Sequence, residues 1–179
     1  MRPLRVAALC LPLLCAVPAA QAASTSKWNT LSTALAVGVP ALAGAESLSQ
    51  NDWPGIGQLA IAEAATVASV LVLKNRIHEE RPDGSGNDSF PSGHTAVVFA
   101  AARYLDKRYG GEHTWMVYSL AGLTGVARVE AKKHYWKDVI AGGAIGFALG
   151  DLSTRYRYAT ISIAPTQGGF ALLWQQPLQ

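Results

Sequence analysis

The sequence has 179 residues, of which 50% are hydrophobic and 15% are charged, and its formal net charge is +3. The length is typical of one domain, and the composition excludes the disordered, collagen-like and coiled-coil classes. So small a positive excess does not provide a nucleic-acid-binding surface, and we expect no nucleic-acid partner.

The first 22 residues predict a secretory signal peptide. Arg2 and Arg5 form its basic part, an apolar run covers 6–17, and Ala20-Gln21-Ala22 provides a cleavage site of small residues. We therefore expect removal of residues 1–22 and export to the periplasm; an uncleaved amino-terminal anchor is the alternative. The remaining 157 residues contain no cysteine and carry 13 Lys and Arg against 12 Asp and Glu, so the mature protein would be nearly neutral and without disulfides.

Residues 23–157 form the predicted domain, which is all-α. Apolar residues recur there at helical spacing, and linkers rich in polar residues, proline and glycine divide them. The pattern predicts a compact bundle of helices at roughly 29–48, 54–79, 91–109, 113–130 and 135–157.

The carboxyl-terminal residues 158–179 differ from the bundle. Thr160 to Ile163 alternates between polar and apolar residues, a Gln-Gly-Gly turn follows at 167–169, and residues 170–174 are typical of a return strand. We expect a small β-hairpin packed on the bundle; a docking surface for a membrane or a partner is the alternative.

The length of the uncharged stretches bears on membrane insertion. Within the predicted bundle the longest stretch, 28–45, has 18 residues and is interrupted by Pro40, whereas a crossing helix needs roughly 20 apolar residues. The pattern favours a helical domain that is soluble or rests on a bilayer surface. A protein with several membrane-spanning helices is the alternative, since helices rich in glycine and alanine also pack in membranes.

Lys74 and Arg81, the latter followed by Pro82, form the first cluster that points to chemistry. Seven residues are almost two helical turns, so we expect both cations on one helical face, about 10 Å apart along the axis, where they can converge on one anion. Two solvated surface cations are the alternative.

The segment Pro91-Ser92-Gly93-His94 begins a predicted helix. The first N–H groups of a helix have no intrahelical partner and suit a phosphate, to which Gly93 gives access and Ser92 adds a hydroxyl donor. His94 then lies beside the bound group. A capped helix with a surface histidine is the alternative.

Arg128, His134 and Asp138 form the third cluster. His134 and Asp138 are one helical turn apart, so the carboxylate can hydrogen-bond one ring nitrogen and leave the other as a nucleophile. Arg128 can face the same site only if the helix breaks before His134, around 131–133. A structural His–Asp pair on a helix surface is the alternative.

The three clusters, Lys-x6-Arg-Pro, Pro-Ser-Gly-His and Arg-x5-His-x3-Asp, in this order, resemble the signature of the type 2 phosphatidic acid phosphatase (PAP2) superfamily over about residues 30–157. That superfamily contains lipid phosphatases, class A acid phosphatases and vanadium haloperoxidases. This chain has Ala127 before Arg128, where the family's third motif usually has serine. The resemblance implies an all-α bundle of the same type and a phosphoric ester hydrolase.

The resemblance also implies a role for each motif residue. His134 is the nucleophile, Asp138 orients it, and His94 is the general acid and base. The phosphate-binding residues are Lys74, Arg81, Ser92, Gly93 and Arg128. We expect no metal and no cofactor, because three cations can neutralise the phosphate.

The sequence thus predicts an exported, metal-independent phosphatase that contacts a membrane surface. Its substrates would be phosphomonoesters or pyrophosphates, above all lipid phosphates, and the reaction would pass through a phosphohistidine. A soluble periplasmic acid phosphatase of broad specificity is one alternative, and a non-catalytic protein that binds phosphate or lipid is another. The sequence leaves the particular substrate and the oligomeric state open.

Overall fold

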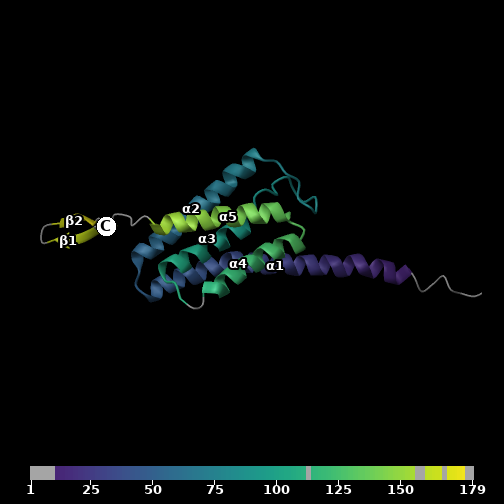
Figure 1. Cartoon of the computed structure of the whole chain (residues 1–179), viewed down its shortest axis with the longest axis horizontal. Coiled ribbons are helices and arrows are strands. Elements are labelled where there is room, and N and C mark those ends of the chain that lie inside the picture. Colours follow the sequence, from purple (N-terminus) through teal and green to yellow (C-terminus); the bar gives the residue numbers. More distant parts are fainter. Residues whose placement is uncertain (1–10, 112–113, 156–159, 167–168, 176–179) are drawn as a thin grey trace, which may run out of the picture.

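The computed structural model describes residues 11–111, 114–155, 160–166 and 169–175. Within them, five helices confirm the predicted all-α bundle (Figure 1). They are α1 (Leu11–Ser49), α2 (Trp53–Arg76), α3 (Gly93–Arg108), α4 (Thr114–Glu130) and α5 (Trp136–Arg155). The predicted boundaries agree with these within three residues, except at the start of α1.

α1 begins at Leu11 and runs without interruption through the predicted cleavage site at Ala20-Gln21-Ala22. Residues 1–10, which include Arg2 and Arg5, lie outside the described part of the chain. The signal peptide therefore stays a prediction.

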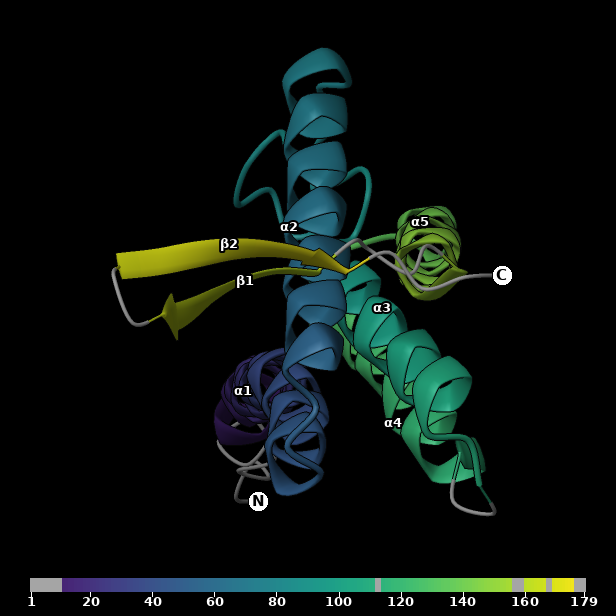
Figure 2. The ribbon, with the colours of Figure 1, turned by 90° about the vertical axis from the view of Figure 1, so that its left-hand side faces the viewer.

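α3 is the central helix, and the other four helices pack around it (Figures 1 and 2). Small apolar side chains are fully buried all round its axis, namely Ala96, Val98, Ala100, Ala101 and Ala102. Tyr104 is buried beside them, and its hydroxyl lies 2.7 Å from Ser47 Oγ on α1. Because these buried side chains are short, the neighbouring helices approach α3 closely on several sides.

A stripe of three glycines on α5, at four-residue spacing, sets the contact with α3: Gly142, Gly146 and Gly150. A Cβ atom added to Gly146 would lie 1.9 Å from the carbonyl oxygen of Ala96, far inside the 3.0 Å that real Cβ atoms keep. Only glycine permits so close an approach of the two backbones. The stripe therefore holds the middle of α5 against the first half of α3.

Ion pairs gather at the two ends of the bundle, as with Asp52–Arg108 at one end and Arg81–Asp88 at the other. The helices also expose large apolar side chains, and five of these are at least 60% exposed: Val37, Trp53, Val72, Trp115 and Ile140. Ser24–Ser49 of α1 and Trp53–Arg76 are long and apolar enough to cross a membrane by length and composition, with mean hydropathies of 1.4 and 1.8. Exposed apolar surface of this extent is typical of proteins that contact lipid or a partner.

β1 (Thr160–Thr166) and β2 (Gly169–Gln175) pair as an antiparallel hairpin. The strands confirm the predicted hairpin, while residues 167 and 168 of its turn lie outside the described part of the chain. Figure 1 shows the hairpin beyond the end of α5 and apart from the helices, so the expectation that it packs on the bundle is wrong. The reason is the direction of α5, whose carboxyl end at Arg155 points out of the bundle.

Candidate active site

Two loops meet at one end of the bundle and carry most of the predicted site. The longer loop, 77–92, connects α2 to α3, and the shorter loop, 131–135, connects α4 to α5. Lys133 joins the two loops, because its Nζ lies 2.5 Å from Oδ2 of Asp83. The loops thus bring together residues that are far apart in the sequence.

The predicted break between Arg128 and His134 is confirmed. α4 ends at Glu130, Lys132 adopts a positive φ of 53°, and α5 begins at Trp136. On one continuous helix, six residues would place Arg128 and His134 on separate faces. The turn removes this constraint.

Lys74 and Arg81 do not share a helical face, because α2 ends at Arg76. The expectation of one shared helical face is wrong, because the backbone already leaves the helix at Ile77, which is extended with φ −116° and ψ 104°. The two cations nevertheless converge on one carboxylate: Arg81 Nη2 lies 2.8 Å and Lys74 Nζ 3.6 Å from Asp88 Oδ2. Burial raises the pKa of Asp88, but the hydrogen bond and charge of Arg81 and the charge of Lys74 outweigh it, and the pKa is lowered.

Arg128, in the last turn of α4, is only 3% exposed and reaches α1. Its Nη1 donates hydrogen bonds to Asn29 Oδ1 at 2.7 Å and to Ser32 Oγ at 3.3 Å. This role of α1 was not predicted. The signal that could have indicated it is the run of polar residues Asn29, Ser32 and Thr33 on one face of an otherwise apolar helix.

His134 is buried, and its Nδ1 lies 2.6 Å from the backbone carbonyl oxygen of Ser89. The predicted hydrogen bond to Asp138 is wrong, because Asp138 Oδ2 is 3.7 Å away and accepts instead from Ser89 Oγ at 2.6 Å and from the Tyr135 N–H at 2.9 Å. A carbonyl oxygen can only accept, so the ring proton must lie on Nδ1. The lone pair of the imidazole is then on Nε2.

His94 is the second residue of α3, and its Nε2 lies 3.4 Å from Thr33 Oγ1 on α1. Burial lowers the pKa of His94 to about 4 and that of His134 to about 3. These values already include the nearby charges of Arg128, Arg81 and Lys74, which act in the same direction as burial. Two neutral imidazoles thus lie within the field of the same three cations.

Ser92 and Gly93 form the start of α3, as predicted, but the Ser92 hydroxyl is fully buried and lies 2.9 Å from Thr95 Oγ1. The Ser92 backbone N–H donates to the carbonyl oxygen of Asp138 at 3.0 Å. Ser92 therefore ties α3 to α5 in this structure. Phosphate binding by Ser92 and Gly93 stays a prediction.

Three buried polar atoms of the site have no hydrogen-bond partner among the described residues: Arg81 Nε, Arg128 Nε and Asp138 Oδ1. Buried polar groups are nearly always paired. Two unpaired guanidinium donors in the field of Lys74 therefore suit a ligand that accepts hydrogen bonds and carries negative charge. A phosphate group has both properties.

Comparison with known proteins shows which family shares these residues. The sequence profile of the PAP2 superfamily matches residues 55–162, which include all three motif clusters. A lipid A 1-phosphatase of Porphyromonas gingivalis is 40% identical over 75 residues, which make up 40% of this chain and 17% of that protein. A lipid A 4'-phosphatase of Helicobacter pylori is 30% identical over 131 residues, 66% of this chain and 66% of that protein.

The crystal structure of Aquifex aeolicus LpxE shows the same fold, with a TM-score of 0.55 and 23% identity. The match covers 73% of this chain and 94% of that one. The matched part is less than two thirds of either curated relative described above. Since the family profile covers more than half of the sequence and all three motifs, the chain belongs to the PAP2 superfamily.

Proposed function

We propose that this protein is a metal-independent phosphatase that hydrolyses phosphomonoesters or pyrophosphates, lipid phosphates in particular, through a phosphohistidine. One observation carries the proposal: the charges of Lys74, Arg81 and Arg128 act on the imidazoles of both His94 and His134, and the two arginines hold unpaired guanidinium donors. Fixed positive groups of this kind stabilise the negative charge on the equatorial oxygens of a phosphoryl group in the transition state of its transfer. They would provide the charge neutralisation that other phosphatases obtain from a metal ion.

In the proposed reaction, Nε2 of His134 attacks phosphorus while the bond from phosphorus to the ester oxygen breaks. His94, protonated when the phosphate dianion is bound, gives this proton to the departing oxygen, so an alcohol leaves and the ring becomes neutral. His94 then takes a proton from water, the resulting hydroxide attacks phosphorus, and the bond to His134 breaks to release phosphate. Asp138 acts as a positioning residue, because its contact with His134 passes through Ser89.

Lipid phosphates are favoured as substrates by two observations. The curated relatives include lipid A phosphatases, and two apolar helices, α1 and α2, are long enough to place the protein in a membrane. Together with the predicted signal peptide, this supports an exported protein whose site meets lipid headgroups at the membrane surface.

Phosphate release from lipid and soluble phosphomonoesters by the detergent-purified protein, with and without a chelator, tests the proposal. We expect His134→Ala to lose about a thousandfold or more in rate, whereas His78→Ala, an exposed histidine outside the site, serves as the matched control. Acid-labile radioactive phosphate on the denatured wild-type protein, and none on His134→Ala, would identify the phosphohistidine. Near-normal activity of His134→Ala would refute the mechanism, and phosphate binding without hydrolysis would favour the non-catalytic alternative.

A further inference from the structure

An apolar groove of about 220 Å³ lies between α1, α2 and α3. Its walls include Ala36 from α1, Val67 and Leu71 from α2, and Val97 from α3, and its one polar side chain is that of His94. We propose that this groove, which we call the leaving-group groove, binds the hydrocarbon part of the alcohol that the enzyme releases. The inference rests on the proposed function and deepens it, because it says where the substrate's lipid portion lies.

The in-line geometry of the proposed reaction indicates that the leaving alcohol lies at this groove. In phosphoryl transfer the attacking and leaving atoms are roughly in line with phosphorus. If His134 attacks from one side, the departing oxygen lies on the other side, next to the acid His94. The carbon atoms attached to that oxygen must then continue past His94, and the groove that His94 itself lines is the space beside it.

The contact between His94 and Thr33 marks the polar end of the groove. Thr33 precedes Ala36 on α1 by three residues, which is almost one helical turn. Its hydroxyl is 3.4 Å from His94 Nε2. The residue that would donate the proton is thus part of the lining of the groove. From there it contains only apolar side chains, which suit an alkyl or acyl chain and no polar substituent.

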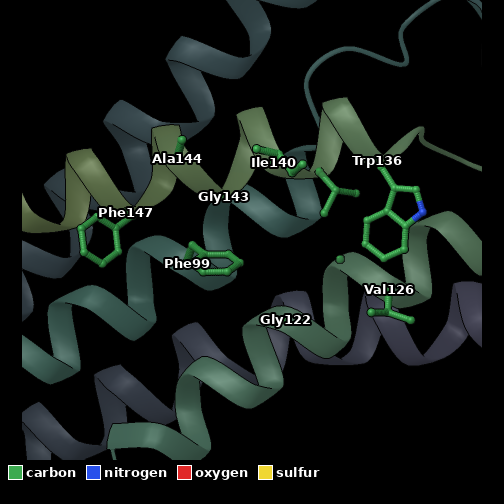
Figure 3. Close-up of a pocket in the computed structure, with 10 residues that line it drawn as sticks. Phe99, Gly122, Val126, Trp136, Ile140, Gly143, Ala144 and Phe147 are labelled. Carbon is green, nitrogen blue, oxygen red and sulfur yellow. The ribbon is translucent and has the colours of Figure 1, made fainter.

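A larger cavity, of about 560 Å³, lies between α3, α4 and α5 and is the main competitor for the chain (Figure 3). Figure 3 shows the rings of Phe99, Trp136 and Phe147 around it. Its lining includes Trp136, two residues after His134 in the sequence, and none of the residues that line the leaving-group groove. A chain in that cavity would extend from the attacking side of phosphorus, which in-line displacement does not allow.

The outer walls of the leaving-group groove open towards the apolar surface of the molecule. Val67 is 44% and Leu71 is 54% exposed, although both line the groove. Both residues lie on α2, one of the two helices apolar enough to cross a membrane. A lipid chain could therefore pass from the groove into the surrounding bilayer while its phosphate reaches the cations.

A series of butyl, hexyl and octyl phosphates, each below its micelle-forming concentration, tests the groove. Burying a methylene provides ~0.8 kcal/mol, so kcat/KM of the wild-type protein should rise by about fourfold per methylene. Val67→Phe and Leu71→Trp fill the groove from exposed positions that tolerate larger side chains. Each should flatten this dependence to less than about twofold per methylene.

Two matched variants distinguish the groove from its neighbours. Val72→Phe adds the same ring to an exposed position of α2 outside the groove, and Ala144→Phe fills the larger cavity. Both should keep the wild-type dependence on chain length. A flattened dependence in Ala144→Phe, or an unchanged one in both groove variants, would overturn the inference. Equal wild-type rates on all three substrates would refute the groove alone, whereas no phosphate release from any of them would refute the proposed function itself and the groove with it.

Discussion

The ring nitrogen Nδ1 of His134 is held by the backbone carbonyl of Ser89, at 2.6 Å, rather than by a carboxylate. In a serine-protease triad the equivalent nitrogen faces an aspartate, and replacing that aspartate by asparagine leaves the wrong tautomer. Here the main chain itself fixes the tautomer. The carboxylate of Asp138 does not contact the ring nitrogen through a hydrogen bond; it accepts one from the Ser89 hydroxyl at 2.6 Å.

The substitution Asp138→Asn should therefore lower kcat less than the equivalent substitution does in a serine-protease triad. We expect kcat to fall by about 10- to 100-fold, because the variant loses the negative charge near the developing imidazolium but keeps the tautomer, whereas a triad loses about 10⁴-fold. Nitrogen-15 NMR of the ring should show the proton still on Nδ1. Ser89→Ala is the companion variant, since it removes the hydroxyl and keeps the carbonyl. A triad-like loss together with a shifted tautomer would contradict this arrangement.

The low pKa of His94 predicts that activity falls as the pH rises. In the free enzyme this pKa is about 4, because burial and then the charges of Arg128, Arg81 and Lys74 disfavour the protonated ring. Only the protonated ring can serve as the acid, so kcat/KM for an alkyl phosphate should decline above about this pH. A bound phosphate dianion offsets the cations and raises the pKa, which moves the decline of kcat to higher pH.

Lys74→Gln provides the control for the pH profile, because it removes one of the charges that lower the pKa of His94. The decline of kcat/KM should shift to higher pH in this variant, while the titration of the substrate itself stays the same. Stopped assays across the pH range, with both proteins on one substrate, measure the difference. Superimposable profiles would show that His94 is not the acid.

Asp88 occupies the two cations Lys74 and Arg81, and we expect it to compete with phosphate for them. Asp88→Asn should strengthen inhibition by inorganic phosphate about tenfold, because a negative charge is removed beside the bound anion. Asp83→Asn, in the same loop but paired with Lys133, is the matched control. Weaker inhibition in Asp88→Asn would show that the carboxylate positions the cations more than it competes.

Substitution of Asn29 tests the contribution of α1 to the site through Arg128. α1 lies outside the stretch matched by the family profile. Asn29→Ala leaves a buried guanidinium N–H of Arg128 without its 2.7 Å acceptor, and hydrogen bonds to charged groups contribute ~1.5–3 kcal/mol. We expect kcat/KM to fall by about 10- to 100-fold, mainly through KM. Thr30→Ala, an exposed neighbour on the same helix, should behave like the wild-type protein. Equal losses in both variants would point to a general weakening of α1.

Gly146 should be intolerant of any side chain. Gly146→Ala places a Cβ 1.9 Å from the Ala96 carbonyl oxygen, so the two helices must separate, at a cost of ~1–3 kcal/mol or more in unfolding free energy. Gly57→Ala is the opposite case, since its added Cβ meets nothing within 4 Å on α2 and should stabilise the protein by ~0.5–1 kcal/mol. Thermal unfolding in detergent measures both. A melting temperature of Gly146→Ala equal to that of the wild-type protein would contradict the close packing.

The sequence by itself determined the helices, because helical periodicity, glycines and prolines act over a few neighbouring residues. It also located Lys74, Arg81, His94, Arg128 and His134, since motif spacing is local. It failed for the alignment of Lys74 with Arg81, because α2 ends at Arg76 and Arg81 lies in the loop that follows.

Only the tertiary structure decided which groups these residues contact. The carbonyl that holds His134 is 45 positions away in the sequence, and the amide that holds Arg128 is 99 positions away. Such contacts arise from how α1 packs against α4 and how the loops 77–92 and 131–135 meet, which depends on the buried faces of all the helices together. No local pattern encodes them, because each partner is an ordinary polar residue until the fold brings it to the site.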